Sequence, residues 1–189
     1  MKKIGIVVVF LVMLSLTMSA SALESKTITR NNGVSAYASW DKTTADGYEF
    51  TYLGVMESKT GTDVFVYTCK YDQQGNGTCK DGSASTTDDV LTVDNKLNSA
   101  TLSTNVNMYD YNTGEITIVP ITVSWTGAGD LVRSNSHSIS KSSDFIFKFS
   151  DSVVYRTAVA TGTFDGNDLG NSNYAEIDQF KTASMSTTK

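Results

Sequence analysis

The chain is poor in the residues that carry most acid, base and thiol chemistry. Its 189 residues include one histidine, two cysteines and one proline. A Ser/His/Asp hydrolase would need His137 as its base, and no nucleophile-elbow motif accompanies that residue. We therefore interpret His137 as a solvent-facing strand residue and assign no catalytic residue.

An excess of positive charge is also absent, since the formal net charge is −5 at pH 7. Sequence-independent binding to nucleic acid depends on cationic contacts to phosphate, and anionic membrane surfaces attract basic segments in the same way. The composition therefore predicts no nucleic-acid partner and disfavours an anionic membrane surface.

One hydrophobic run stands out, residues 4–18 at the start of the chain. Lys2 and Lys3 precede this run, and the small residues Ser-Ala-Ser-Ala follow it at 19–22. This order predicts a cleaved secretory signal peptide over residues 1–22, because a signal peptidase accepts small side chains at such an exit. An uncleaved N-terminal anchor is the alternative.

Residues 23–189 would then form the mature protein. No stretch of it is proline-rich, highly charged or long enough to act as a linker, so we expect a single domain. We expect this domain to be secreted, in an extracellular or periplasmic space, and not inserted in a membrane.

Both cysteines fall in the mature part, as Cys69 and Cys79. An even pair in an exported protein predicts a disulfide. Residues 74–77, Gln-Gly-Asn-Gly, tolerate positive φ and can reverse the chain between two strands. The bond would therefore staple a hairpin. The spacing is not the C-x-x-C of a redox-active pair.

Strand patterns dominate the mature chain, and helical patterns are almost absent. Segments rich in β-branched and aromatic residues predict strands over 34–40, 48–56, 64–71, 90–93, 100–108, 115–125, 131–139, 145–149 and 153–164. Several alternate, as Phe145, Phe147 and Phe149 do, which predicts one buried and one wet face.

The strands are joined by turn clusters, including Lys80-Asp81-Gly82-Ser83, and this order is typical of an antiparallel meander or Greek key. Without covering helices, such a sheet must hide its apolar face against a second sheet or close on itself. We predict an all-β, Ig-like antiparallel β-sandwich, with a small β-barrel as the alternative. Pro120 predicts an edge or a bulge in its strand.

Three segments carry a family resemblance: residues 91–100 (LTVDNKLNSA), residues 124–129 (SWTGAG) and residues 158–170, with A-x-A-x-G followed by DGxxLG. They resemble segments of uncharacterised secreted all-β microbial proteins. The resemblance implies export and a β fold, and it implies no activity, ligand or catalytic residue.

The best metal candidate is the loop 165–176. Asp165, Asn167 and Glu176 stand at the first, third and twelfth positions of a calcium loop, with glycine at the sixth. Leu169 occupies the fifth position, where an oxygen ligand belongs, and no helices flank the loop. A polar β-turn is therefore the alternative, and we expect no cofactor apart from calcium at this site.

Aromatic rings are the best candidates for ligand contacts, because exposed rings can stack on sugar faces. The rings to consider are Trp40, Trp125, Tyr37 and Tyr48. Their alternative role is core packing, which Trp125 suggests by ending an alternating apolar strand.

We therefore expect an exported, non-enzymatic extracellular or cell-envelope domain that binds or scaffolds, with a glycan or protein partner at the cell surface. The alternatives are a secreted hydrolase that uses carboxylates distant in the chain and a carbohydrate-binding module. A concave pocket with converging acids would favour the hydrolase, and a platform of rings would favour binding.

Overall fold

The computed structural model describes residues 25–188, so the predicted signal peptide lies outside the described residues. Within this range no helix is long and apolar enough to cross a membrane. The strands are β1 (Ser25–Thr44), β2 (Gly47–Ser58), β3 (Gly61–Asp72), β4 (Gly77–Thr86), β5 (Leu91–Val93), β6 (Ser99–Asp110), β7 (Ile116–Gly127), β8 (Val132–Lys141), β9 (Phe145–Phe164), β10 (Asn167–Asp168) and β11 (Tyr174–Thr188).

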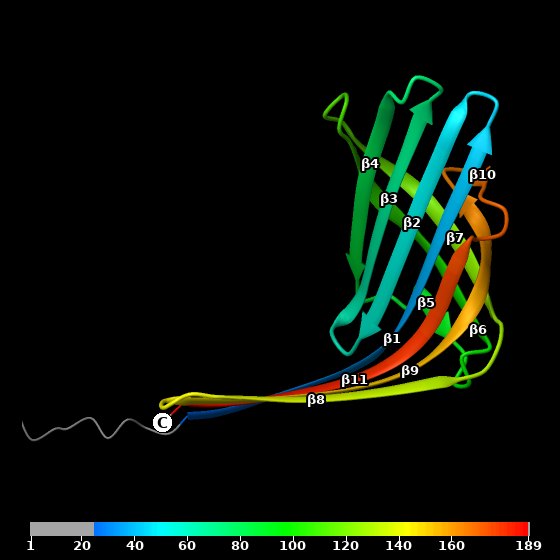
Figure 1. The fold of residues 1–189 in the computed structure, drawn as a ribbon. Coiled ribbons are helices and arrows are strands. Elements are labelled where there is room, and N and C mark those ends of the chain that lie inside the picture. Colours follow the sequence, from blue (N-terminus) through cyan, green and yellow to red (C-terminus); the bar gives the residue numbers. More distant parts are fainter. Residues whose placement is uncertain (1–24, 189) are drawn as a thin grey trace, which may run out of the picture.

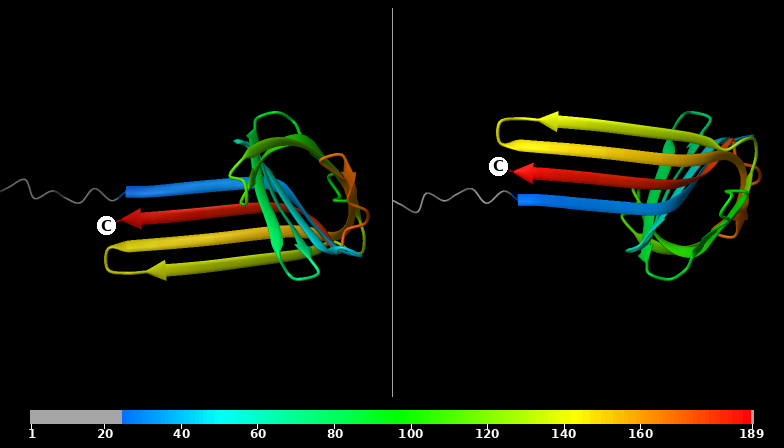
Figure 2. Two further views of the ribbon diagram at one scale, coloured as in Figure 1. Left: turned by 90° about the horizontal axis from the view of Figure 1, so that it is seen from above. Right: turned by 90° about the horizontal axis from the view of Figure 1, so that it is seen from below.

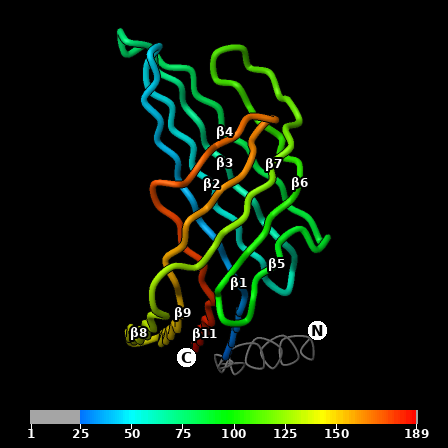
Figure 3. The backbone as a smooth tube through the Cα atoms, turned by 90° about the vertical axis from the view of Figure 1, so that its right-hand side faces the viewer, coloured from blue at the N-terminus to red at the C-terminus, as the bar shows by residue number. Residues whose placement is uncertain are grey.

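All strands belong to one antiparallel sheet, which confirms the all-β antiparallel prediction. The order β9-β11-β1-β2-β3-β4-β6 continues through β7, which pairs with β6 on one side and with β9 on the other. The sheet therefore closes on itself, and its walls face each other across the core (Figures 2 and 3). We call this closed part the body.

Alternation places the apolar side chains inside the body. The largest fully buried side chains are Trp125, Leu53, Leu102, Met108, Ile121 and Ile177. They come from β2, β6, β7 and β11, so every wall contributes to one core. Burying such a side chain stabilises the fold by roughly 1.5 to 3 kcal/mol, and closure of the sheet is what makes this burial possible without helices.

Four strand segments leave the body as a flat, open sheet, which we call the arm (Figures 1 and 2). It consists of β8, residues 145–155 of β9, residues 178–188 of β11 and residues 25–35 of β1, in that order. The registers are continuous, so directly paired residues share a face along the whole arm. The arm has no second layer, and most of its side chains are exposed or half-buried.

Several strand predictions need correction. The first half of β1 and all of β11 were not predicted, and Lys80-Asp81-Gly82-Ser83 lies inside β4 rather than in a turn. The two strands predicted over 145–149 and 153–164 form the single strand β9. These segments are rich in Ser, Thr, Lys and Asp, and they are strands because neighbours pair with them on both sides over part of their length.

Pro120 lies opposite Asn105 of β6, one residue before β9 begins to pair with β7 at Ile121. Residues 116–120 of β7 therefore form an edge on the side of β9. This confirms the edge position that proline predicts, since proline has no N–H for a ladder bond.

The predicted disulfide between Cys69 and Cys79 is present. The two residues are directly opposed in the β3–β4 hairpin, with their Cα atoms 4.1 Å apart. Gly75 in the connecting turn has a φ of 82°, a conformation that glycine adopts without strain. The disulfide therefore fixes the register of this hairpin.

Replacing both cysteines (C69S/C79S) should lower the free energy of unfolding by about 2 to 3 kcal/mol, because the unfolded chain loses a short covalent loop. Urea unfolding of the double variant and of the parent measures this. Equal urea midpoints for parent and variant would contradict the stabilising role of the disulfide. As a control, the parent under reducing conditions should unfold at the midpoint of the variant.

One carboxyl group is buried where the arm joins the body. Asp178 is 6% exposed and lies directly opposite Ser35, whose hydroxyl donates a hydrogen bond to Asp178 Oδ1. Burial raises the pKa of Asp178 to about 6, and the Ser35 hydrogen bond opposes this shift. The carboxylates of Glu176 and Asp151 raise it further. The folded protein therefore holds a proton here more tightly than the unfolded chain.

This proton makes stability depend on pH in a definite direction. The contribution of Asp178 is fully present below the unfolded pKa of about 4 and is lost as the pH rises through about 6. D178N removes the titration and should stabilise the protein at pH 7 by on the order of 1 kcal/mol, allowing for solvent near the carboxyl group. Thermal melts between pH 4 and 7 should show a smaller pH slope in D178N; an unchanged slope would contradict this.

Candidate functional site

The inner surface of the body changes from apolar to polar toward the end opposite the arm. On β1 the inward positions run from Ala36 through Trp40 to Lys42, and on β3 they run from Val66 to Lys70. Side chains alternate along each strand, and paired residues on neighbouring strands lie side by side. The pairing register therefore places the change from apolar to polar at the same level on these strands. The core therefore ends below this level, and the last two levels form an open mouth.

Two rows of paired residues line one side of the mouth. The inner row is Trp40, Thr51, Thr68 and Lys80, and the outer row is Lys42, Glu49, Lys70 and Thr78. Threonines are too short to reach across the body, and lysines keep their ammonium groups toward water. The mouth is therefore not filled by side chains, and a cavity of about 440 Å³ remains. This volume lies within the range of small-ligand sites.

Charges in the cavity are partly paired. Lys70 Nζ lies 3.1 Å from Glu49 Oε1, and Lys80 Nζ lies 3.0 Å from Asp110 Oδ2. The backbone N–H of Asn112, followed by the Lys80 ammonium, holds the pKa of Asp110 below its ordinary value. The cavity therefore presents ammonium and carboxylate groups together, without a strong excess of either sign.

Hydroxyl groups complete this wall. Thr51 Oγ1 and Thr68 Oγ1 are 3.1 Å apart, and Thr68 donates a hydrogen bond to the carbonyl of Phe50 at 3.1 Å. Thr51 is 7% exposed. Because Thr68 donates its only hydroxyl proton to Phe50, Thr51 is the donor between the two threonines, and the pair offers acceptor oxygens at the base of the cavity.

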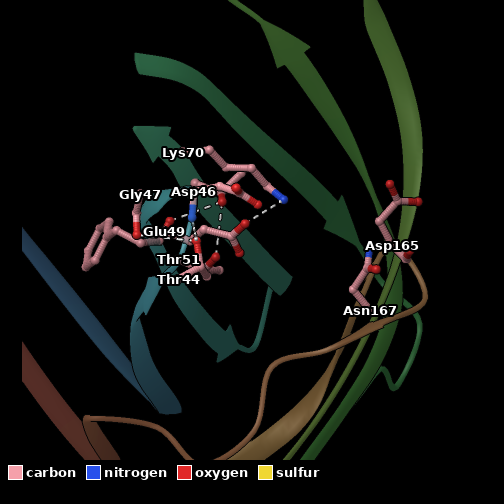
Figure 4. Close-up of polar contacts among 10 residues, drawn as sticks. Thr44, Asp46, Gly47, Glu49, Thr51, Lys70, Asp165 and Asn167 are labelled. Carbon is pink, nitrogen blue, oxygen red and sulfur yellow. Dashed lines mark hydrogen bonds and ion pairs between the residues drawn. The ribbon is translucent and has the colours of Figure 1, made fainter. Parts of the chain in front are cut away.

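The β9–β10 hairpin and the residue after it form the opposite wall, with Asp165, Asn167, Asp168 and Leu169. Figure 4 shows Asp165 and Asn167 across the mouth from the Glu49–Lys70 pair. The turn depends on positive φ at Asp165 (52°) and the following glycine (73°). The hairpin is therefore held in place as a wall of the site.

The indole of Trp40 connects the two walls. It is 4% exposed, and its Nε1–H donates to the carbonyl of Gly170 at 3.2 Å. Trp40 thus forms the floor of the cavity, at the boundary between the apolar core and the polar mouth.

The other predicted rings lie elsewhere. Trp125 is buried in the core and donates from Nε1 to the carbonyl of Tyr37 at 2.8 Å. Tyr37 is half-buried and faces outward, because it alternates with core-facing alanines. Tyr48 is exposed, donates to Asp41 at 2.6 Å and stacks on Tyr71. Of the four rings, only Trp40 lines the cavity.

The calcium candidates are divided between two faces of the sheet. Asp165 and Asn167 line the cavity, whereas Glu176 alternates with the core residues Ala175 and Ile177 and therefore points outward. Glu176 accepts a hydrogen bond from the hydroxyl of Tyr174 at 2.8 Å. Among residues 25–188 no group of three or more His, Cys, Asp and Glu side chains could hold a metal ion.

His137 lies on β8 in the arm, exposed to solvent. The residues paired with it across the arm are Ser150, Ala183 and Arg30, so no carboxylate shares its row. The described structure therefore contains no Ser/His/Asp arrangement at this residue.

Sequence reasoning missed most of the cavity, including Lys42, Glu49, Thr51, Thr68 and Lys70. The available signal was a polar residue at the inward position of a strand that is otherwise apolar inside, as in Val64-x-Val66-x-Thr68-x-Lys70. In one strand alone, such a change from apolar to polar inward residues indicates only the end of the strand. It indicates a cavity when the neighbouring strands become polar inside at the same level.

Comparison with known proteins gives no further guide to the site. No family model, no curated protein and no solved structure matches this chain. The observations therefore define an all-β protein with one closed antiparallel sheet, a polar cavity at one end and a flat arm at the other.

Proposed function

We propose that this protein is a secreted, non-enzymatic binding protein that takes a segment of an oligosaccharide into the mouth cavity. The observation that carries the proposal is the combination at one place of an indole floor, a threonine hydroxyl pair and alternating ammonium and carboxylate groups. Sugars offer an apolar ring face and many hydroxyls, and such sites commonly combine an aromatic side chain with a few convergent polar groups.

Each wall has a separate task in this proposal. Trp40 closes the floor beneath the apolar face of a sugar ring, and the hydroxyl oxygens of Thr51 and Thr68 accept hydrogen bonds from the hydroxyls of that ring. Asn167 and the Glu49–Lys70 pair bond the outer part of the ligand. Because the ammonium and carboxylate groups are nearly balanced, we expect a neutral saccharide to bind better than a free ion.

Secretion is part of the proposal. The predicted signal peptide over residues 1–22 supports it, and the Cys69–Cys79 disulfide is compatible with an extracellular or periplasmic space. The resemblance to secreted all-β microbial proteins remains a prediction that agrees with this placement.

The threonine pair gives the sharpest test. T51V/T68V replaces two hydroxyls by methyl groups of the same shape. A glycan array first identifies the oligosaccharide that the parent binds best. The double variant should bind this oligosaccharide about 10- to 100-fold more weakly, because the sugar hydroxyls lose two hydrogen-bond partners. Calorimetric titration of residues 23–189 with that oligosaccharide measures the loss.

The matched control is T122V/T163V, because these threonines are also directly opposed but lie exposed on the outer face of β7 and β9. It should bind as the parent does. Equal weakening in both variants, or no binding to any oligosaccharide, would overturn the proposal.

The hydrolase alternative rests on Glu49 and Asp165, which lie on opposite walls of the cavity (Figure 4). Glu49 is ion-paired with Lys70, so its carboxylate already has a partner in the cavity. Release of reducing ends by the parent and its loss in E49Q would establish the hydrolase instead of the binding protein.

A further inference from the structure

The arm segregates its charges by face. Because registers are continuous, the residues of the arm divide cleanly into two faces. One face continues the core-facing side of the body wall, and we call it the cationic face. Its basic residues are Lys26, Arg30, Arg133, Lys141, Lys148 and Lys181, with His137 among them.

Within the arm, no carboxylate accompanies these cations on their face, and the neighbouring acid on the same side is Glu57 of β2, which lies directly opposite Val34 at the base of the arm. Of the nearby acids, Asp151 and Asp178 lie on the opposite face, and Asp144 lies in the β8–β9 turn, where it accepts a hydrogen bond from Ser143. All six basic side chains are exposed. The positive field of this face is therefore not compensated within the arm, although the whole chain has a net charge of −5.

The cations are spread over a flat surface. Arg133 and Lys141 are eight residues apart on β8, which corresponds to roughly 26 Å, and the four strands span roughly 14 Å across. At physiological ionic strength charges act over about 8 Å. A ligand on the outer part of this face therefore senses its cations, whereas at the base of the arm Glu57 lines the same hollow as Lys181.

We propose that the cationic face binds an acidic polysaccharide chain, independently of the mouth cavity. The Lys and Arg side chains pair with carboxylate or sulfate groups spaced along the chain. Asn32, Asn135 and Ser152 lie on the same face and can bond its hydroxyls.

Two other polyanions fit this face less well. The body rises from the end of the arm on the side of this face (Figure 1). A planar membrane would therefore collide with the body before it reached the whole face. A thin polysaccharide chain can lie along the face, in the angle between the arm and the body. The face carries no Phe, Tyr or Trp on which the bases of a single-stranded nucleic acid could stack.

The test uses residues 23–189 and polygalacturonate, with its fully methyl-esterified form as a neutral chain of the same backbone. The parent should bind the acid form, with an affinity that falls as salt is added, and not the ester. K148E should weaken binding about five- to ten-fold, and K148R should retain it. K96E makes the same charge change on an exposed lysine of the body and should have less than about a two-fold effect.

Unchanged melting temperatures establish that K148E is folded, which we expect because Lys148 is exposed. T51V/T68V should bind polygalacturonate as the parent does, which separates this proposal from the cavity. Equal effects of K148E and K96E, binding of the ester, or stronger binding to single-stranded DNA or to phosphatidylglycerol vesicles would overturn it.

Discussion

Pairing between β7 and β9 is the constraint on which the rest of the structure depends. Seven residue pairs, from Ile121↔Phe164 to Gly127↔Ala158, join the ends of what would otherwise be an open sheet. An open sheet without helices would leave Trp125 and Ile121 in water, and closure buries both. Gly162 supports this contact, since a Cβ there would clash with the carbonyl oxygen of Thr122.

Closure also explains why the mouth can be hollow. Ladder hydrogen bonds between β1, β2, β3 and β4 hold this wall together at the level of Thr51 and Thr68, where apolar packing has already ended. The wall therefore keeps its shape without a filled interior, and polar side chains can face a cavity at little cost in stability. The arm is the opposite case, because its strands continue beyond the ring and have only their ladders to hold them.

Much of the fold could be predicted from local pattern. Alternating segments such as Ala100–Met108, the glycine turns and the cysteine pair indicated an antiparallel all-β domain, because period two and turn chemistry are local properties. β11 could not be predicted in this way. Its Ser, Thr and Lys residues become a strand because β1 and β9 flank it along most of its length, and such pairing is a property of the whole chain.

The candidate site was less predictable than the fold. Trp40 was identified by residue type, but the same reasoning selected Trp125, which lies in the core. Residues from β1, β2, β3, β4 and the β9–β10 hairpin meet at the cavity only because the ring fixes their level. A sequence shows each inward polar residue, but it does not show that neighbouring strands turn polar at one height. The cationic face was hidden in the same way, since its members come from four strands distant in the chain.

The measurement that tests closure most directly is cross-strand disulfide formation in S124C/T161C. Ser124 and Thr161 are directly opposed on β7 and β9, and both are exposed on the outer face. The account predicts that this pair oxidises in the folded protein as readily as S103C/T122C, a directly opposed exposed pair on β6 and β7. Peptide mapping that finds the bond in S103C/T122C but not in S124C/T161C would show that the sheet is open, and would contradict the account.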